Sequence, residues 1–393
     1  MTIEISYENG SFIAPIKAGI VKIEGDGVGP EIWRAAEPIF LEAAKKEGFE
    51  VVFIEALAGE RAYQETGSAL PVATLEALKK YRIGLKGPLG TPTGGGIRSL
   101  NVAIRKALDL YACVRPVKHI PGAPSPMKNP EGLDLLIFRE NTEDVYAGLE
   151  WPANSSEAQK LIQFLRDELG VQVDSQAAIG LKPMSETNSK RLIRLALAWS
   201  IREKRPSLTL VHKGNIMKFT EGAFLKWGQE LTGAEFSQEA VVRAEAKEND
   251  PRLIVKDCIA DNMFTQVLLR PSEYSSIAAP NLNGDYLSDA LAGQIGGLGL
   301  APGANLGEGL GVFEATHGTV PARKGLDMVN PSSLLLSGAM AFDHIGWPSV
   351  GQRIRAAIGQ TIKEGFMTYD LARLAGLNPI GTMAFGQAVL SRL

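Results

Sequence analysis

Cysteine is scarce in this chain of 393 residues: only Cys113 and Cys258 are present, and they form no CxxC pair. A disulfide framework or a thiolate zinc site is therefore not expected, and the thiol content fits a reducing cytoplasm. No run approaches the roughly 18 consecutive apolar residues of a membrane span. The first residues also lack the basic-then-apolar layout of a signal peptide. We expect a cytoplasmic protein with no membrane partner.

An excess of charge of one sign is also missing, because 41 basic residues face 44 acidic ones and the formal net charge is -3. Such a balance gives no field that would attract nucleic acid. We therefore expect a small-molecule partner and no nucleic acid.

Apolar strand-like runs alternate with amphipathic helical stretches along almost the whole chain, as in AGIVKI followed by PEIWRAAEPIFLEAAKKEG. This rhythm predicts an α/β fold with a mostly parallel sheet and helices on both faces. The more polar segment 151–173 breaks the rhythm and is interpreted as an insertion that forms an arm or a dimer contact.

Glycine, in contrast, is abundant, and its first cluster is GDGVG at Gly25 to Gly29. The cluster is not GxGxxG, and no acidic residue stands at the distance that holds a ribose in a conventional Rossmann site. We interpret it as a simple tight turn.

A second glycine loop, from Gly87 onward, leads directly into a helix, whose N-terminus favours anions. Ser99 stands at that entry, and Asn101 and Arg105 share one helical face. Arg115 and Arg139 follow at helix and strand ends. Arginines so placed can grip carboxylates bidentately, which suggests a multi-carboxylate pocket, although unrelated surface charges are the alternative.

Acidic residues recur at a spacing of four, as Asp257 with Asp261 and Asp285 with Asp289. This spacing stacks carboxylates on one helical face, where they repel unless something compensates. Mg²⁺ or Mn²⁺ would do so, whereas helix capping is the simpler alternative.

Tyr146 and Lys213 stand in loops, and Lys213 follows an apolar strand-like run. Such residues serve proton transfer when their pKa values are shifted, although either one alone is more often structural.

Longer motifs carry a family resemblance: EGDGVGPEIW, GPLGTPTGGGIRSLNVAIR, IFRENTEDVYAGLEW, LVHKGNIMKFTEGAF, NLNGDYLSDALAGQIGGLGLAPGANLG and FEATHGTVPARKGLDMVNP. In this order they resemble the decarboxylating β-hydroxyacid dehydrogenases, and among them bacterial-type isocitrate dehydrogenases. The resemblance implies an isopropylmalate dehydrogenase-like three-layer α/β fold rather than a conventional Rossmann fold. It implies a large domain at 1–110 and 296–393, a small domain at 111–143 and 186–295, and a clasp at 144–185 that interlocks a homodimer.

The resemblance also implies roles for the site residues. Isocitrate carboxylates would be bound by Ser99, Asn101, Arg105, Arg115 and Arg139. Tyr146 and Lys213 would transfer protons, with Lys213 reaching into the neighbouring subunit's site. Asp261 of that same neighbour would join Asp285 and Asp289 around the metal. Oxidation and loss of CO₂ would then yield 2-oxoglutarate. A serine and an asparagine at the helix entry favour isocitrate over isopropylmalate, and Gly90 departs from the threonine of close relatives.

The same resemblance implies a cofactor site formed by Thr91, Arg270, His317, Gly318, Thr319, Val320, Pro321, Ala322, Arg323, Asn330, Tyr369 and Arg373. NADP-type relatives have Lys-Tyr after the loop proline, and NAD-type ones have an aspartate followed by an apolar residue. Ala322 and Arg323 match neither type. Because the ribose-binding aspartate is absent and Arg323, Tyr369, Arg373 and Arg270 can contact a 2′-phosphate, NADP is favoured over NAD.

Two other interpretations stay open. The first is an NAD-dependent isocitrate or homoisocitrate dehydrogenase, and the second is a catalytically silent regulatory subunit. The silent subunit is disfavoured because such subunits lose proton-transfer or metal residues, all of which are retained here.

Overall fold

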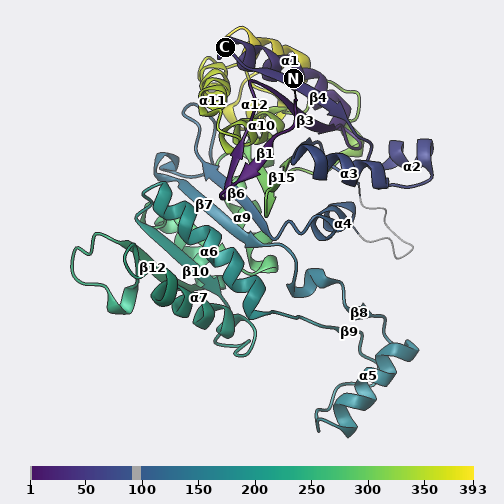
Figure 1. Cartoon of the computed structure of the whole chain (residues 1–393), viewed down its shortest axis with the longest axis vertical. Helices are drawn as coiled ribbons and strands as arrows, with labels where there is room; N and C mark the ends of the chain where they lie inside the picture. Colours follow the sequence, from purple (N-terminus) through teal and green to yellow (C-terminus); the bar gives the residue numbers. More distant parts are fainter. Residues whose placement is uncertain (1, 91–98) are drawn as a thin grey trace.

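The fold is described from a computed structural model, which covers residues 2–90 and 99–393. Thr91, expected at the cofactor site, lies outside the described residues. Both chain termini lie at the same end of the molecule (Figure 1). A β-hairpin of β1 (Ser6–Glu8) and β2 (Ser11–Ile13) precedes the main sheet.

One sheet of 11 strands runs through the body of the molecule in the order β11-β12-β10-β13-β7-β6-β14-β15-β5-β3-β4. Its strands are β3 (Lys17–Ile23), β4 (Glu50–Glu55), β5 (Ile83–Lys86), β6 (Ala112–Lys118), β7 (Asp134–Glu140), β10 (Ser207–His212), β11 (Ala240–Val242), β12 (Leu253–Ile259), β13 (Ser276–Ala279), β14 (Pro302–Gly307) and β15 (Leu310–Ala315). Parallel pairing dominates in both outer parts, as the sequence predicts. Within this sheet, among the residues that the structure describes, only the pairs β7·β6, β6·β14 and β14·β15 are antiparallel.

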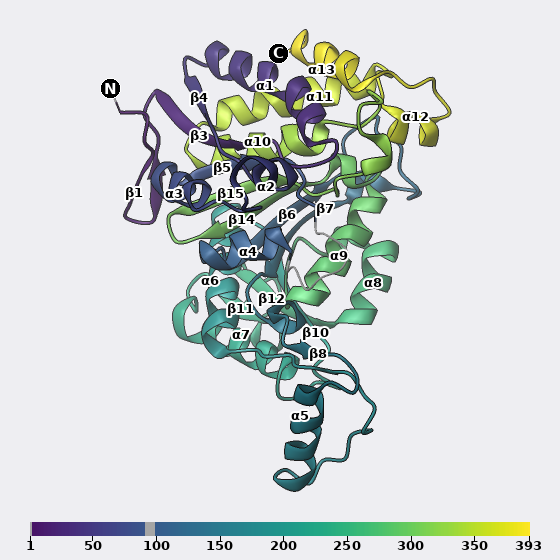
Figure 2. The same cartoon turned by 90° about the vertical axis from the view of Figure 1, so that its right-hand side faces the viewer.

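Helices cover both faces of this sheet (Figures 1 and 2). They are α1 (Gly29–Lys46), α2 (Glu60–Thr66), α3 (Val72–Tyr81), α4 (Leu100–Ala107), α6 (Glu186–Arg202), α7 (Glu221–Glu235), α8 (Ala260–Leu269), α9 (Asn281–Gln294), α10 (Ser332–His344), α11 (Pro348–Lys363), α12 (Tyr369–Ala375) and α13 (Thr382–Leu390). Helices α6 and α7 lie on one side of the lower part of the sheet, and α8 and α9 lie on the other (Figure 2). This arrangement is the α/β fold that the alternating pattern predicts, and it differs from a conventional Rossmann fold in its antiparallel centre.

Aromatic side chains fill the core between α1 and α10. Phe40 of α1 packs edge-on against Phe342 of α10, with ring centroids 5.9 Å apart. A Cβ on Gly338 would stand 2.3 Å from the Phe40 ring, so only glycine permits this approach of the two helices. Burying a phenylalanine contributes roughly 1.5–3 kcal/mol. Gly338→Ala would therefore force the two helices apart.

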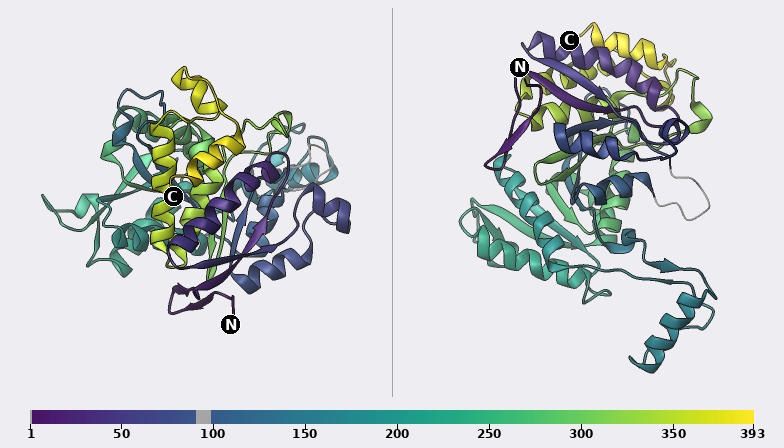
Figure 3. Two further views of the ribbon diagram at one scale, coloured as in Figure 1. Left: turned by 90° about the horizontal axis from the view of Figure 1, so that it is seen from above. Right: turned by 45° about the vertical axis from the view of Figure 1, so that its right-hand side comes forward.

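The polar insertion forms an arm that projects from the body (Figures 1 and 3). It contains helix α5 (Ser156–Asp167) and a two-stranded ribbon of β8 (Glu150–Trp151) and β9 (Ile179–Gly180). Ser155 caps α5 by accepting a hydrogen bond from the Ala158 amide at 3.2 Å. The predicted interruption at 151–173 thus coincides with this arm, while the domain boundaries remain predictions.

Candidate active site

Helix α4 places Asn101 and Arg105 on one face, with Ser99 as its N-cap residue. The Arg105 guanidinium is buried and donates to Glu314 Oε1 at 3.1 Å. The Asn101 amide oxygen is buried without a hydrogen-bond partner among the described residues. A buried polar atom without a partner is available to a bound ligand.

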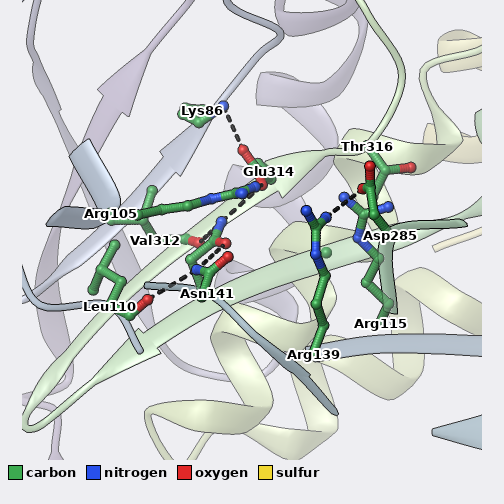
Figure 4. Close-up of polar contacts among 12 residues, drawn as sticks. Lys86, Arg105, Leu110, Arg115, Arg139, Asn141, Asp285, Val312, Glu314 and Thr316 are labelled. Carbon is green, nitrogen blue, oxygen red and sulfur yellow. Dashed lines mark hydrogen bonds and ion pairs between the residues drawn. The ribbon is translucent and has the colours of Figure 1, made fainter. Parts of the chain in front are cut away.

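Glu314, near the end of β15, contacts several polar side chains in this part of the site (Figure 4). Its carboxylate lies 2.5 Å from Lys86 Nζ and accepts a hydrogen bond from the Asn305 amide at 2.7 Å. Burial alone would raise the pKa of Glu314, but the charges of Lys86 and Arg105 more than offset that effect and lower it. Glu314 therefore stays ionised and holds Arg105 in place.

Arg115 of β6 and Arg139 of β7 come from neighbouring antiparallel strands. Arg115 Nη1 donates to Asp289 Oδ1 at 2.8 Å. Arg139 Nη1 contacts Asp285 Oδ1 (Figure 4). Arg139 Nε also donates to the Asn281 side-chain oxygen at 2.9 Å. Both aspartates lie on α9, so one helix organises two arginines.

The three guanidiniums act on one another electrostatically. Burial, together with the charges of Arg105 and Arg115, lowers the pKa of Arg139. Like charges gathered in a buried place favour an anionic ligand, and guanidinium pairs well with carboxylate. Sequence reasoning selected Arg105, Arg115 and Arg139 for this pocket, and the structure brings them together.

Tyr146 lies in a short 3₁₀ helix, Asp144–Ala147, beside this cluster. Its hydroxyl donates to Asp285 Oδ2 at 2.5 Å, and the Arg139 guanidinium lies 4.9 Å from its ring centroid. Burial, reinforced by the hydrogen bond to Asp285, raises the pKa of Tyr146 to about 12. The phenol is therefore protonated at neutral pH and can donate a proton.

Lys213 and Asp261 pair with each other, away from this cluster. Lys213 follows β10, as predicted, and its Nζ lies 2.5 Å from Asp261 Oδ1 in the first turn of α8. The Asp261 side chain is 70% exposed. Neither residue has a hydrogen bond or ion pair to Tyr146, Asp285 or Asp289 within the described chain.

The predicted helical face shared by Asp257 and Asp261 is wrong. Asp257 belongs to strand β12, and its carboxylate lies 3.5 Å from His212 Nε2. The apolar run LIVKDCI, with its β-branched residues, keeps the strand going until Ile259, so a spacing of four does not place these two carboxylates together.

Asp285 and Asp289 do share a face of α9, one turn apart. Burial raises the pKa of Asp289, and the nearby Asp285 charge adds to that rise against the opposing charge of Arg115. Across residues 2–90 and 99–393, no group of three or more His, Cys, Asp or Glu side chains is close enough to hold a metal ion. One chain thus offers two of the three predicted ligands together.

The GDGVG turn lies against the predicted cofactor loop. The Val28 amide donates to the Thr319 carbonyl at 3.0 Å. A Cβ on Gly27, whose φ is +59°, would stand 2.0 Å from that same carbonyl oxygen. The turn therefore requires glycine for close backbone approach, in agreement with the prediction of a tight turn.

The predicted phosphate contacts are partly brought together. The Arg323 guanidinium lies 5.0 Å from the centroid of the Tyr369 ring, and Arg373 follows on the same helix, α12. Asn330 donates to Asp370 Oδ2 at 3.1 Å. Of the remaining loop residues, His317, Gly318, Thr319 and Val320 precede the 3₁₀ helix Pro321–Arg323, and Pro321 and Ala322 belong to it.

Arg270 stands apart from this group. It lies at the end of α8, where its Nη1 is 3.9 Å from Glu273, and none of its ion pairs within the described chain reaches the loop. The structure therefore does not bring Arg270 to the other phosphate contacts within one chain.

Several polar partners escaped sequence reasoning, namely Lys86, Asn281, Asn305 and Glu314. Glu314 lies 209 positions after Arg105, so local spacing carries no sign of the pair. A single acidic residue ending the apolar run GVFEA was the available signal, because an unpaired buried carboxylate is unfavourable.

Fold and site together define an α/β protein with a cluster of buried arginines beside a protonated tyrosine, an arrangement suited to a small polycarboxylate. Comparison with known proteins gives a matching result, because the isocitrate/isopropylmalate dehydrogenase family profile matches residues 19–389. The chain belongs to the isocitrate/isopropylmalate dehydrogenase family.

Individual relatives match over the whole chain. An isocitrate dehydrogenase (NADP) of Archaeoglobus fulgidus is 51% identical, covering 99% of this chain and 96% of that protein. A Streptococcus mutans protein of the same name is 48% identical and covers 100% of both. The solved structure of isocitrate dehydrogenase from Methylococcus capsulatus superposes with a TM-score of 0.80 at 37% identity, covering 95% of this chain and 98% of that one.

Proposed function

We propose that this chain catalyses the oxidative decarboxylation of isocitrate to 2-oxoglutarate and CO₂, with reduction of NADP. The observation that carries the proposal is the buried cluster of Arg105, Arg115 and Arg139 beside Tyr146. Full-length relatives named isocitrate dehydrogenase (NADP) support the substrate and the cofactor.

Substrate binding would exchange the arginines' present partners for substrate carboxylates. Arg105, Arg115 and Arg139 now pair with Glu314, Asp289 and Asp285. Bidentate guanidinium–carboxylate contacts are stronger than neutral hydrogen bonds, so they can orient a tricarboxylate. The Ser99 hydroxyl and the side-chain NH₂ of Asn101, at the start of α4, would donate to the remaining carboxylate.

Tyr146 is the proton donor to the carbon that loses CO₂, because its raised pKa keeps it protonated. Its hydrogen bond to Asp285 aims the hydroxyl into the arginine cluster. Lys213 would accept the proton of the substrate hydroxyl, acting from a second copy of the chain.

NADP, when bound, accepts a hydride from the substrate. The loop 317–323 and Asn330 would hold the adenosine part. Arg323 and Tyr369, which lie together, form the 2′-phosphate site with Arg373. Arg323 replaces the lysine that NADP-type relatives have at the position of Ala322.

A divalent metal, Mg²⁺ or Mn²⁺, would be held by Asp285 and Asp289 with Asp261 from a second copy. The fit is supported by the mutual repulsion of Asp285 and Asp289, which a cation relieves, and by their hard oxygen donors. Such a metal polarises a bound hydroxyl or carbonyl oxygen.

A homodimer with shared sites is the proposed assembly. The loop after Lys213 exposes Ile216 and Phe219, the latter at 93%, and the end of α8 exposes Leu268 and Leu269. Exposed apolar side chains on the loop after Lys213 and at the end of the helix that carries Asp261 are typical of a protein interface. Phe164 on the arm is also exposed. A second copy of the chain would cover the arm as well as the surface near Lys213.

Location in the cytoplasm is part of the same proposal. Both cysteines are free and buried, as suits a reducing compartment. No helix among residues 2–90 and 99–393 has the length and apolar character needed to cross a membrane.

The direct test is the initial rate of reduced-nicotinamide formation from D-isocitrate with Mg²⁺, comparing NADP with NAD. We expect kcat/KM to favour NADP by more than about tenfold, which is roughly 1.4 kcal/mol of transition-state binding. A preference for NAD would overturn the assignment of the 2′-phosphate site. A preference for homoisocitrate over isocitrate would overturn the assignment of the substrate. Absence of turnover with either cofactor would instead support a silent subunit.

A further inference from the structure

The two legs of the arm are joined at its base. The Asp144 amide donates to the Pro183 carbonyl at 3.0 Å, and the Ser185 amide donates to Glu143 Oε2 at 2.7 Å. The chain returning from the arm therefore lies directly against the segment that leads to Tyr146. Lys182, which precedes Pro183, is at this junction.

Lys182 bridges two buried carboxylates. Its Nζ contacts Asp144 Oδ1 and lies 3.0 Å from Glu221 Oε1. Asp144 and Glu221 side chains are 1% and 0% exposed. Buried carboxylates are strongly unfavourable without a compensating cation, and no other ion pair reaches either of them within the described residues.

Asp144 holds the Tyr146 segment against helix α9. Its carboxylate accepts hydrogen bonds from the Val145 amide at 2.7 Å and from the Leu282 amide at 3.0 Å. Asp144 itself has a φ of +68°, an uncommon conformation for a non-glycine residue, and these two hydrogen bonds help to hold it. Asp144 thereby fixes the turn that presents Tyr146 to Asp285.

Glu221 holds the Lys213 loop against the same helix. Its Oε2 accepts hydrogen bonds from the Lys213 amide at 2.5 Å and from the Asn283 side chain at 2.8 Å. Three segments therefore meet at one lysine: the Tyr146 turn, the Lys213 loop and the start of α9.

We propose that Lys182 is a positioning residue, which fixes Tyr146 and Lys213 relative to α9 by neutralising Asp144 and Glu221. The inference rests on the proposed function for the roles of Tyr146 and Lys213. In the proposed dimer these two residues serve different active sites. Lys182 thus connects both sites to the base of the arm, and a change in the arm's seating is transmitted to each of them.

The test is Lys182→Met, with Lys190→Met as the matched control. Lys190 also pairs with two glutamates, and its side chain is 24% exposed against 17% for Lys182, but it lies on α6 outside the site. We expect Lys182→Met to lower kcat about 10- to 100-fold, the effect of misplacing catalytic groups by roughly 1 Å, while KM for isocitrate changes little. Lys182→Arg should restore most of the rate. Equal kcat values for the Lys182→Met and Lys190→Met variants would overturn the proposal.

Amide hydrogen exchange gives a readout that does not depend on turnover. The Val145, Leu282 and Lys213 amides donate hydrogen bonds to the carboxylates of Asp144 and Glu221. Hydrogen exchange at these three amides should be faster in Lys182→Met than in the wild type, and it should be unchanged in Lys190→Met. If the wild-type protein turns over no isocitrate but exchange is still faster in Lys182→Met than in the wild type, the proposed function is overturned and the positioning role of Lys182 stands. Unchanged exchange would overturn the positioning even if isocitrate is the substrate.

Glu221→Gln covers the case in which Lys182→Met fails to fold. This variant removes one buried charge, and the neutral amide oxygen that remains accepts a weaker hydrogen bond from the Lys213 amide than the carboxylate does. We expect a smaller loss of kcat in the same direction and faster exchange at Lys213 alone. Wild-type values of both quantities would contradict the proposal.

Discussion

The arginine cluster and the Lys213–Asp261 pair illustrate two ways of presenting charge. Arg105, Arg115 and Arg139 are buried, and each already has a carboxylate partner from its own chain. Lys213 and Asp261, by contrast, pair with each other at the surface, with Asp261 70% exposed. The difference is what the proposed function requires: one chain gathers the proposed substrate-binding arginines, while the proposed proton-transfer lysine and third metal ligand serve a second copy.

The largest expected effect is a loss of kcat when a proposed proton-transfer residue of either region is replaced. Such losses in both regions would show that the two regions serve one reaction. Tyr146→Phe and Lys213→Met should each lower kcat by about 10²- to 10⁴-fold, because each removes a proton-transfer group. KM for isocitrate should change far less, since the arginines remain. Steady-state kinetics measures both parameters, with Tyr63→Phe as the control because Tyr63 is 63% exposed.

A full rate in Lys213→Met together with a large loss in Tyr146→Phe would break the comparison. The exposed pair would then be an ordinary surface ion pair and no part of an active site.

The second prediction concerns stability. Glu314→Gln leaves buried Lys86 and Arg105 without their carboxylate, so we expect a loss of about 3–5 kcal/mol in the free energy of unfolding. Asp261→Asn should leave it almost unchanged, because an exposed pair contributes little. Urea unfolding of both variants measures the contrast, and equal losses would contradict the buried-versus-exposed distinction.

The pH dependence of that stability has a definite sign. The folded-state pKa of Glu314 is lowered, so its contribution is present above the ordinary glutamate pKa of about 4.3 and is lost as the pH falls below it. Glu314→Gln should therefore show a shallower loss of stability in acid than the wild type. An identical acid slope would indicate that Glu314 is not the group responsible.

A smaller effect is expected at the proposed cofactor loop, where Arg323 and Tyr369 lie together. Arg323→Ala should lower kcat/KM for NADP roughly tenfold or more, the value of a hydrogen bond to a charged group. The rate with NAD serves as the internal control, because NAD lacks the 2′-phosphate. Equal losses with both cofactors would place Arg323 elsewhere on the nucleotide.

Local patterns predicted the fold class and much of the cluster, because hydrophobic period and glycine position report on a residue's own element. The spacing of Asp285 and Asp289 predicted a shared face of α9, and the end of an apolar run placed Lys213 after β10. The same spacing failed for Asp257, where β-branched neighbours extend a strand.

Long-range pairing was beyond such reasoning. Lys182 lies 38 positions after Asp144, and its second partner, Glu221, follows on a helix whose sequence looks ordinary. Only the folded chain shows that three segments require one cation between them. The sequence likewise indicated the arm as an interruption of the alternating pattern, but it did not indicate the hydrogen bond between Ser185 and Glu143 that joins the two ends of the arm.

Complementation between two inactive variants tests the central claim most directly. Tyr146→Phe and Lys213→Met are purified separately, mixed, dissociated and allowed to reassociate. If each site takes Tyr146 from one copy and Lys213 from the other, a mixed dimer contains one intact site. Random mixing of a symmetric dimer should then restore about a quarter of the wild-type activity. Activity no higher than that of the separate variants, in a sample shown to contain mixed dimers, would contradict shared active sites.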